Sequence, residues 1–143
     1  MATVSERESI CVALVDLFKK QTTVKFGRVV RDPIIPEELP RTAFPAVYIE
    51  ASDEDREDIA FGVKHLREGV MEVDCVVVIS GKKRNTQLNV AIKAMEDTVN
   101  VDRTLGDKAK DCSLTRIEQL EAGDMSPYSS SRVVFTVSYV YTI

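Results

Sequence analysis

The sequence contains few of the residues that build metal centres and disulfide frameworks. It holds three cysteines and one histidine in 143 residues. Cys11, Cys75 and Cys112 are odd in number, form no C-x-x-C pair and do not lie at ligand spacing from His65. We therefore expect neither a zinc site nor a disulfide framework, and we interpret the thiols as small buried hydrophobes. The sequence predicts no metal and no cofactor.

Long apolar runs are also missing. Residues 1–20 carry Glu6, Glu8 and Asp16 within their apolar stretch, which excludes both the core of a signal peptide and a membrane span. We expect no membrane contact, and we expect the protein to stay in the cytoplasm of the cell that makes it. No Gly/Ser linker, low-complexity block or internal repeat divides the chain, so residues 1–143 are expected to form one domain.

Recognisable catalytic motifs are absent as well. The segment Gly81-Lys82-Lys83-Arg84 stands where a phosphate loop would lie, but Val76 and Lys83 occupy the positions of an essential Gly and Ser/Thr. We interpret this segment as a basic surface turn, with contact to an anion or a partner as the alternative. His65 has no nucleophile in a GxSxG elbow near it and is expected to face solvent. We predict that the protein is not an enzyme.

Amphipathic helices are indicated at two places. Ser5 and Glu8 form a capping box before a helix expected over residues 6–20. A second helix, which Asn85 or Thr86 could cap, is predicted by an apolar stripe at helical spacing: Leu88, Ala91, Ile92, Met95 and Val99. Both helices have one apolar side and therefore need a surface to cover.

Alternating apolar residues predict the strands that form this surface. Strands are expected over residues 24–30, 46–51, 69–80, 113–121 and 132–143, although the spacing in 113–121 also fits a helical turn. Gly27 indicates a bulge or a close backbone approach, and Val76 and Val78 indicate a strand end covered on both faces. Four prolines within residues 33–45 predict an extended loop, and residues 123–131 predict a turn. The expected fold class is α+β, a mainly antiparallel mixed sheet with both helices packed on one face.

Negative charge is concentrated in one segment. Residues 50–58 carry a charge of −5, against −4 for the whole chain, because six carboxylates there face one arginine: Glu50, Asp53, Glu54, Asp55, Glu57 and Asp58 against Arg56. The net charge argues against a nucleic-acid binder, and the calcium-loop pattern is not matched. We interpret the segment as a solvated loop, with a role in a shared opening or an interface as the alternative.

The order of these elements resembles that of the tail terminator proteins of long-tailed bacteriophages, which are also called tail completion or tail-to-head joining proteins. The resemblance covers most of the chain and depends on element order more than on an invariant motif. It includes the N-terminal helix, the strand Phe44-Pro45-Ala46-Val47-Tyr48-Ile49, the charged stretch before residues 67–79, the helix ending near Val99, the turn Asp102-Arg103-Thr104-Leu105-Gly106, and the closing strand 133–141. Many relatives have a second glycine after the Leu-Gly pair, where Asp107 stands here.

The resemblance implies a structural virion protein of the tail or neck, assembled in the cytoplasm of a bacterial host. Its copies would form a ring, commonly a hexamer, that caps the head-proximal end of the tail tube and ends tube polymerisation. The implied partners are further copies of the chain, the tail tube protein and the head–tail connector protein. DNA would pass through the lumen without specific binding.

A closed ring needs contacts between different surface patches of neighbouring copies. We expect the apolar loop around Ile34, Ile35 and Leu39, the exposed region of Phe44 and Phe61, and the basic turn to supply them: Lys82, Lys83 and Arg84. The acidic residues Asp53, Glu54, Asp55, Glu57 and Asp58 would line the lumen or an interface. If they line the lumen, replacing Asp53, Glu54 and Asp55 with lysine is expected to hinder DNA passage and to leave the ring intact.

Two alternative functions remain open at this point. One is a different neck protein, such as a head-completion or connector-adaptor protein. The other is a small-ligand-binding α+β domain with a pocket between sheet and helices. The second alternative needs polar residues on inward positions, whereas the expected inward residues are all apolar: Met71, Val73, Cys75, Val77, Phe135 and Val137.

Overall fold

The computed structural model describes residues 5–60, 66–120 and 127–142. In these residues two helices, α1 (Glu6–Lys20) and α2 (Arg84–Val101), accompany a five-stranded sheet of order β1-β2-β3-β5-β4. The strands are β1 (Arg28–Val30), β2 (Ala46–Ala60), β3 (Leu66–Ser80), β4 (Asp111–Leu120) and β5 (Tyr128–Thr142). Strand β1 runs parallel to β2, and the other neighbours are antiparallel. The predicted α+β class and mixed, mainly antiparallel sheet are confirmed.

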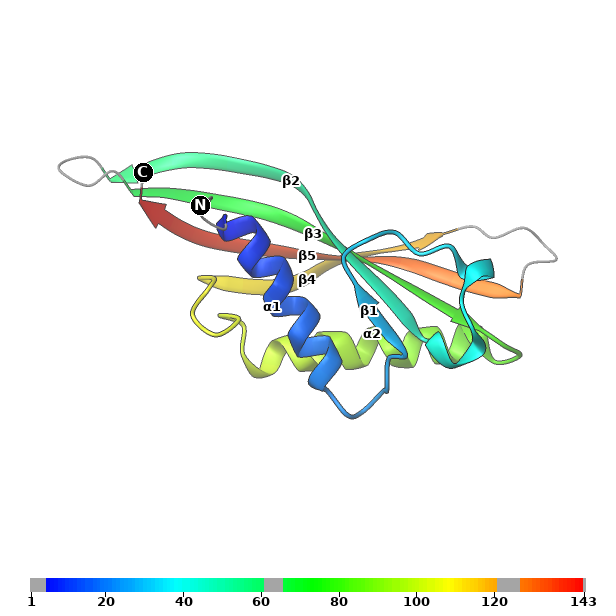
Figure 1. The fold of residues 1–143 in the computed structure, drawn as a ribbon. Helices are drawn as coiled ribbons and strands as arrows, with labels where there is room; N and C mark the ends of the chain where they lie inside the picture. The colour runs from blue at the N-terminus through cyan, green and yellow to red at the C-terminus, as the bar shows by residue number, and fades with distance from the viewer. Residues whose placement is uncertain (1–4, 61–65, 121–126, 143) are drawn as a thin grey trace.

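Both helices cover the same face of the sheet (Figure 1), and α2 connects β3 to β4 across β5. The predicted stripe of α2 is buried throughout, and α1 contributes Ile10, Leu14 and Phe18. These side chains pack on the residues of β3 and β5 that the alternation predicts as inward, each of which is fully buried: Met71, Val73, Cys75, Val77, Phe135 and Val137. Removal of this apolar surface from water is the main force that holds the helices on the sheet.

The two helix starts differ in how they are capped. The Ser5 side chain accepts a hydrogen bond from the Glu8 amide at 3.2 Å, so the predicted start of α1 is confirmed. Helix α2 begins at Arg84 without a side-chain cap, so the predicted cap at Asn85 or Thr86 is wrong. The Asn85 side chain instead accepts a hydrogen bond from Ser129 Oγ of β5 at 3.0 Å, which ties the start of α2 to the sheet.

One end of the sheet is covered on both faces, as the sequence predicts. Val76 and Val78 point away from the helices and are still buried. On this side lies the proline-rich segment between β1 and β2, which includes the 3-10 turns η1 (Pro36–Glu38) and η2 (Arg41–Ala43) (Figure 1). Phe44 of this segment packs on Tyr128, with ring centroids 5.6 Å apart, and the Tyr128 hydroxyl donates to the Pro36 carbonyl at 3.4 Å. The segment that was expected to be an extended loop is therefore folded, and it covers this end of the sheet.

Several strand boundaries differ from the prediction. Strand β1 starts at Arg28, because the Gln21 side chain bonds both backbone groups of Val24 and holds residues 21–24 in a turn. The serines 129–131, expected in a turn, belong to β5 and pair with residues 77–79 of β3. Residues 113–120 form a strand and no helical turn.

The acidic segment is not a solvated loop, so that interpretation is wrong. Strand β2 continues through it to Ala60, paired with β3 from Val73 back to Leu66. Aspartate and glutamate favour strands poorly, but pairing along an adjacent long strand outweighs that intrinsic preference.

None of the helices in the described residues is sufficiently long and apolar to span a membrane.

The close backbone approach expected at Gly27 is confirmed. The Gly27 amide donates to the Pro45 carbonyl at 2.9 Å. A Cβ atom at this position would lie 2.2 Å from the Thr42 carbonyl oxygen. No side chain fits there unless the backbone around η2 moves.

We therefore predict that Gly27→Ala lowers the free energy of unfolding by about 1–3 kcal/mol, because the new methyl group overpacks against backbone atoms. Urea denaturation monitored by circular dichroism would measure the change. Thr23→Ala, an exposed position in the same connection, serves as a control and should change stability by less than about 0.5 kcal/mol. Equal unfolding midpoints for the two variants would contradict the prediction.

Candidate interaction surfaces

Strands β2, β3 and β5 continue past the short strand β1 as an arm, which we define as residues 53–60, 66–72 and 136–142 (Figure 1). Strand β4 still pairs with residues 136–138 at the base of the arm, and beyond them the arm is three-stranded. The arm contains nearly all of the acidic segment. At its base the register of β2 shifts between Ala51 and Glu54, so that Ser52 and Asp53 together face Glu72 of β3. Such a bulge reverses the alternation of side chains. It turns Glu54 to the helix side of the sheet and leaves Asp53, Asp55 and Glu57 on the opposite side.

Glu54 is the carboxylate of the acidic segment whose side chain is buried and whose two oxygens both accept hydrogen bonds. Its side chain is 4% exposed and accepts hydrogen bonds from Arg7 at 2.9 Å, from Arg56 and from the Tyr139 hydroxyl at 2.9 Å. Arg7 also donates to the Ser52 carbonyl at 3.0 Å. Because Arg7 belongs to α1, this cluster fastens the first turn of the helix to the base of the arm.

A glycine makes room for the aromatic member of this cluster. The ring of Tyr139 lies over Gly69 of the neighbouring strand, where a Cβ atom would come within 2.8 Å of the ring carbons. Tyr141 stacks on Tyr139 with centroids 5.6 Å apart, and Arg56 lies over Tyr141 at 5.0 Å from its centroid. Glu54, Arg56 and the two tyrosines therefore form one continuous layer on the helix side of the arm.

The cluster holds Glu54 in its ionised form. Burial raises the pKa of Glu54, but hydrogen bonds from Arg56, Tyr139 and Arg7 outweigh burial, so the pKa lies below the ordinary value of 4.5. Burial and the bond to Glu54 raise the pKa of Tyr139 to about 12. Glu54 was predicted to line a lumen or an interface, but its hydrogen bonds give it a structural role inside the protomer.

The outer side of the arm carries carboxylates that face one another. Glu57 of β2 lies directly opposite Glu68 of β3 in the arm, and Glu50 lies opposite Asp74 just outside its base. Like charges opposite each other destabilise a sheet. Glu68 and Asp74 have partners, Lys110 at 3.3 Å and Arg132 at 3.6 Å. The arm therefore carries more negative charge than its own folding requires.

We define the acidic face as the outward carboxylates of the arm that have no ion pair within the described residues: Asp53, Asp55, Glu57 and Glu72. Asp58 differs, since it pairs with Arg67 at 3.1 Å. Three residues of the acidic face, Asp53, Asp55 and Glu72, line a hollow of about 540 Å³ together with Glu54, Val70 and Thr136. No helix covers this face, because both helices lie on the other side of the sheet.

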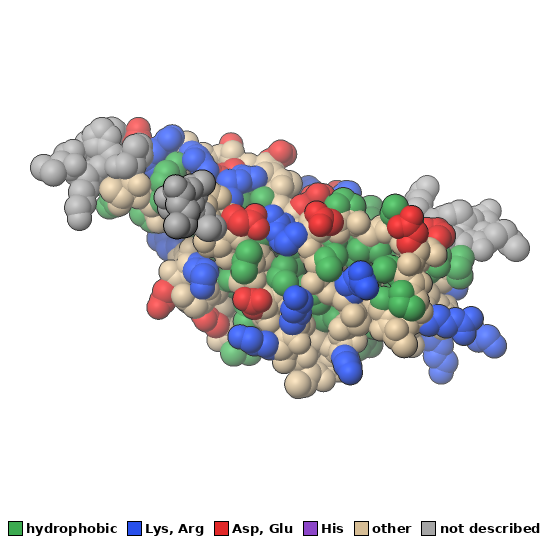
Figure 2. Space-filling model, viewed as in Figure 1, with side chains coloured by type: hydrophobic (Ala, Val, Ile, Leu, Met, Phe, Trp, Pro, Cys, Tyr) green, Lys and Arg blue, Asp and Glu red, His purple; other side chains and the backbone are tan. Residues whose placement is uncertain are grey.

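The opposite end of β3 leads into the basic turn, Lys82, Lys83 and Arg84. Gly81 precedes it with a φ of 115°, a backbone conformation that L side chains rarely adopt, and thus allows the chain to leave the strand sharply. Lys82 and Lys83 are exposed, and Arg84 donates only to the Gly81 carbonyl, at 3.3 Å. Figure 2 shows Lys and Arg side chains projecting from the end of the molecule where β3 turns into α2.

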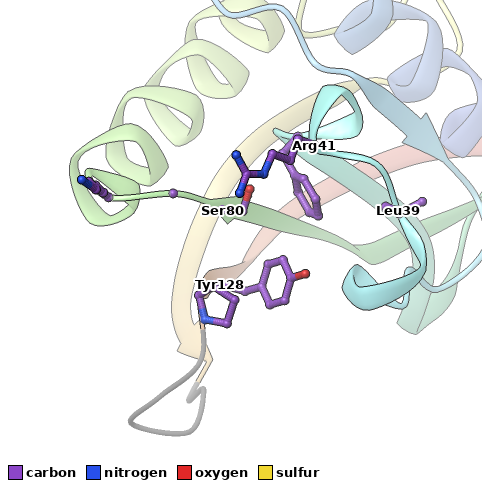
Figure 3. Close-up of a pocket in the computed structure, with 8 residues that line it drawn as sticks. Leu39, Arg41, Ser80 and Tyr128 are labelled. Carbon is purple, nitrogen blue, oxygen red and sulfur yellow. The ribbon is translucent and has the colours of Figure 1, made fainter.

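A second hollow, of about 550 Å³, lies beside this turn. Leu39, Arg41 and Phe44 of the proline-rich segment line one side, and residues 80–82 with Pro127 and Tyr128 line the other. Figure 3 shows Arg41, Ser80 and Tyr128 around one opening, with Leu39 on the side of the proline-rich segment. Arg41 adds a fourth cation to the basic turn and has no ion pair among the described residues.

The remaining predicted contact residues divide between these regions. Ile35 is 55% exposed, whereas Ile34 and Leu39 are half-buried beside it in the proline-rich segment. Phe44, expected to be exposed, is half-buried because it packs on Tyr128. Phe61 lies outside the described residues, as does His65.

The residues that could not be predicted from the sequence are those that contact segments distant in the chain. Arg7, Tyr139, Arg41 and Glu72 are far apart in the sequence, and no motif links them to the segments they join. The one available signal is the glycine at position 69, which stands in an otherwise regular strand and allows an aromatic ring of the next strand to lie across it.

The three cysteines are buried and unpaired, as predicted, and burial raises the pKa of Cys112 to about 12.

We predict that Glu54→Gln lowers the free energy of unfolding near neutral pH by about 1.5–3 kcal/mol, since it removes the ionised acceptor of charged hydrogen bonds. The folded-state pKa of Glu54 is depressed, so this stability is present above the ordinary value of 4.5 and lost as pH falls through the folded-state value. Urea denaturation at about pH 7 and about pH 3 should show the difference shrinking in acid.

The exposed neighbour supplies the control. Asp55→Asn removes a carboxylate that has no ion pair among the described residues, and it should leave stability within about 0.5 kcal/mol of the wild-type protein. A loss for Glu54→Gln that is equally large at both pH values would show that ionisation of Glu54 contributes nothing.

Comparisons with known proteins reveal a similar fold. The sequence matches no family model and no curated protein. A chain of a solved structure, described as the virion of a native gene transfer agent (GTA) particle, is similar to this protein with a TM-score of 0.53 at 11% sequence identity. The similarity covers 97% of this chain and 100% of that chain. At this identity the likeness shows a common fold over almost the whole chain.

Proposed function

We propose that this protein is a structural component of a phage-like virion and, more specifically, a tail terminator. Its copies form a ring, taken here as a hexamer, on the head-proximal end of the tail tube. The ring ends tube polymerisation and presents its other side to the head–tail connector, and DNA passes through its lumen. The protein acts by shape and catalyses no reaction, and it assembles in the cytoplasm of the bacterial host before it becomes part of the tail or neck.

The observation that carries this proposal is the end-to-end likeness to a chain of the GTA virion, which leaves neither chain with a large unmatched domain. Fold alone does not establish function. The element order that resembles tail terminators supplies the second, independent support. The turn at Asp102–Gly106 belongs to it and is built around the Asp102 carboxylate, which accepts hydrogen bonds from the Thr104 amide at 3.1 Å and the Gly106 amide at 2.9 Å.

The protein interior disfavours the ligand-binding alternative. A pocket between sheet and helices needs convergent polar groups. The six inward residues of β3 and β5 that would line such a pocket are apolar and have no exposed surface. Both hollows that we describe lie on the surface, at the acidic face and beside the basic turn. The positions between sheet and helices that a ligand would need are thus filled by apolar side chains.

We predict that particles made without this protein carry tails of abnormal length that fail to join heads. Without a cap, tube subunits would continue to add to an end that still matches them. Negative-stain electron microscopy of lysates would give the tail-length distribution, and expression of the wild-type chain in trans would restore it. Tubes of normal, uniform length that join heads in the absence of the protein would refute the proposal.

The alternative of another neck protein predicts a different binding partner. A tail terminator should bind purified tail tubes at one end, in the absence of heads, whereas a head-completion protein should bind portal complexes in the absence of tails. Cosedimentation of the purified protein with each assembly separates the two. We expect binding to tubes, and binding to portals alone would favour the alternative.

A further inference from the structure

We infer that the acidic face of one copy binds the basic turn of the next copy, so that the ring is held head to tail by charge pairs. The inference rests on the proposed function, because it names the surfaces through which the ring forms. It assigns the outward carboxylates to a contact between protomers and not to the lumen.

The first argument is that both surfaces carry charge that is unpaired within the protomer. Among the described residues, Asp53, Asp55, Glu57 and Glu72 have no cation within 4.0 Å, and Arg41, Lys82, Lys83 and Arg84 have no carboxylate within that distance. Other charged residues of the same sheet do pair, as Glu68 does with Lys110 and Asp74 with Arg132. The two sets have opposite sign, so each supplies the charge that the other lacks.

The second argument is that the two surfaces cannot meet within one molecule. The same strand carries both, with Val70 in the hollow of the acidic face and Ser80 at the basic turn. At about 3.3 Å per residue in a strand, these positions are roughly 33 Å apart. A contact between them therefore joins two copies through different patches, which is the heterologous geometry that a closed ring requires.

The third argument concerns shape and energy. Asp53, Asp55 and Glu72 of the acidic face line an open hollow of about 540 Å³ that neither helix covers, and the basic turn projects from the end of the molecule (Figure 2). A cationic turn seated in this hollow would lie beside Asp53, Asp55 and Glu72, whose charges no cation balances within the described residues.

Charge reversal tests the contact. The triple variants K82E/K83E/R84E and D53K/D55K/E57K should each weaken self-association by about tenfold or more, as measured by analytical ultracentrifugation and native mass spectrometry. The two sets combined in one chain should restore the ring, because the reversed turn then meets a reversed face. Association of the wild-type protein should weaken as salt rises.

Matched controls keep the result interpretable. K19E/K20E/K25E reverses the same number of exposed lysines that have no ion pair in the described residues, and it should leave the ring intact. The neutral variants K82Q/K83Q/R84Q and D53N/D55N/E57Q replace any reversal variant whose circular dichroism shows that it does not fold, and they should weaken association in the same direction.

The outcomes separate this inference from the proposed function. A ring that persists unchanged in both reversal variants would overturn the charge contact but not the tail terminator proposal. If DNA passage through rings of the D53K/D55K/E57K variant were then blocked, that result would favour the lumenal alternative for the acidic face. A wild-type protein that stays monomeric alone and on tail tubes would overturn both.

Discussion

Strands β3 and β5 pair from Leu66–Thr142 to Ser80–Tyr128 without a register shift, and the rest of the structure depends on that pairing. Its unbroken alternation places Val73, Cys75, Phe135 and their neighbours on one face, where α1 and α2 cover them. The same register sets Tyr139 opposite Gly69 and thereby opens the space in which Glu54 is bound. A shift of one residue would turn every one of these side chains to the wrong face.

The elements that could be predicted from the sequence are those whose periodicity is long and regular. The stripe from Leu88 to Val99 and the alternation from Met71 to Ile79 each repeat often enough to define a face, and both are confirmed. The acidic segment was misinterpreted because its composition is typical of a loop, whereas its conformation is imposed by pairing with β3. Residues 129–131 were misinterpreted for the same reason, since serine is common in turns.

The sequence marks the acidic segment as a charged surface but does not separate the roles of its residues. Charge counting along residues 50–58 marked the acidic segment, predicted it as a solvated loop and treated its six carboxylates alike. The bulge at Ser52 and Asp53 then divides them, because it directs Glu54 into a buried cluster with Arg7 and Tyr139 and leaves Asp53 and Asp55 outside. A bulge depends on the register of two strands, so local sequence does not reveal it. The same carboxylate chemistry therefore stabilises the protomer on one face of the arm and remains available to a partner on the other.

Strand β3 extends without interruption from the arm to Gly81, so a single twisted element determines how the two ends of the molecule are oriented. Strands have an inherent right-handed twist that packing on both neighbours fixes. In the head-to-tail ring that we propose, the angle between the acidic face and the basic turn equals the rotation from one subunit to the next. The number of subunits in a closed circle would then be encoded in the coiling of this one strand, and substitutions that flatten it, even far from any contact, would alter the stoichiometry.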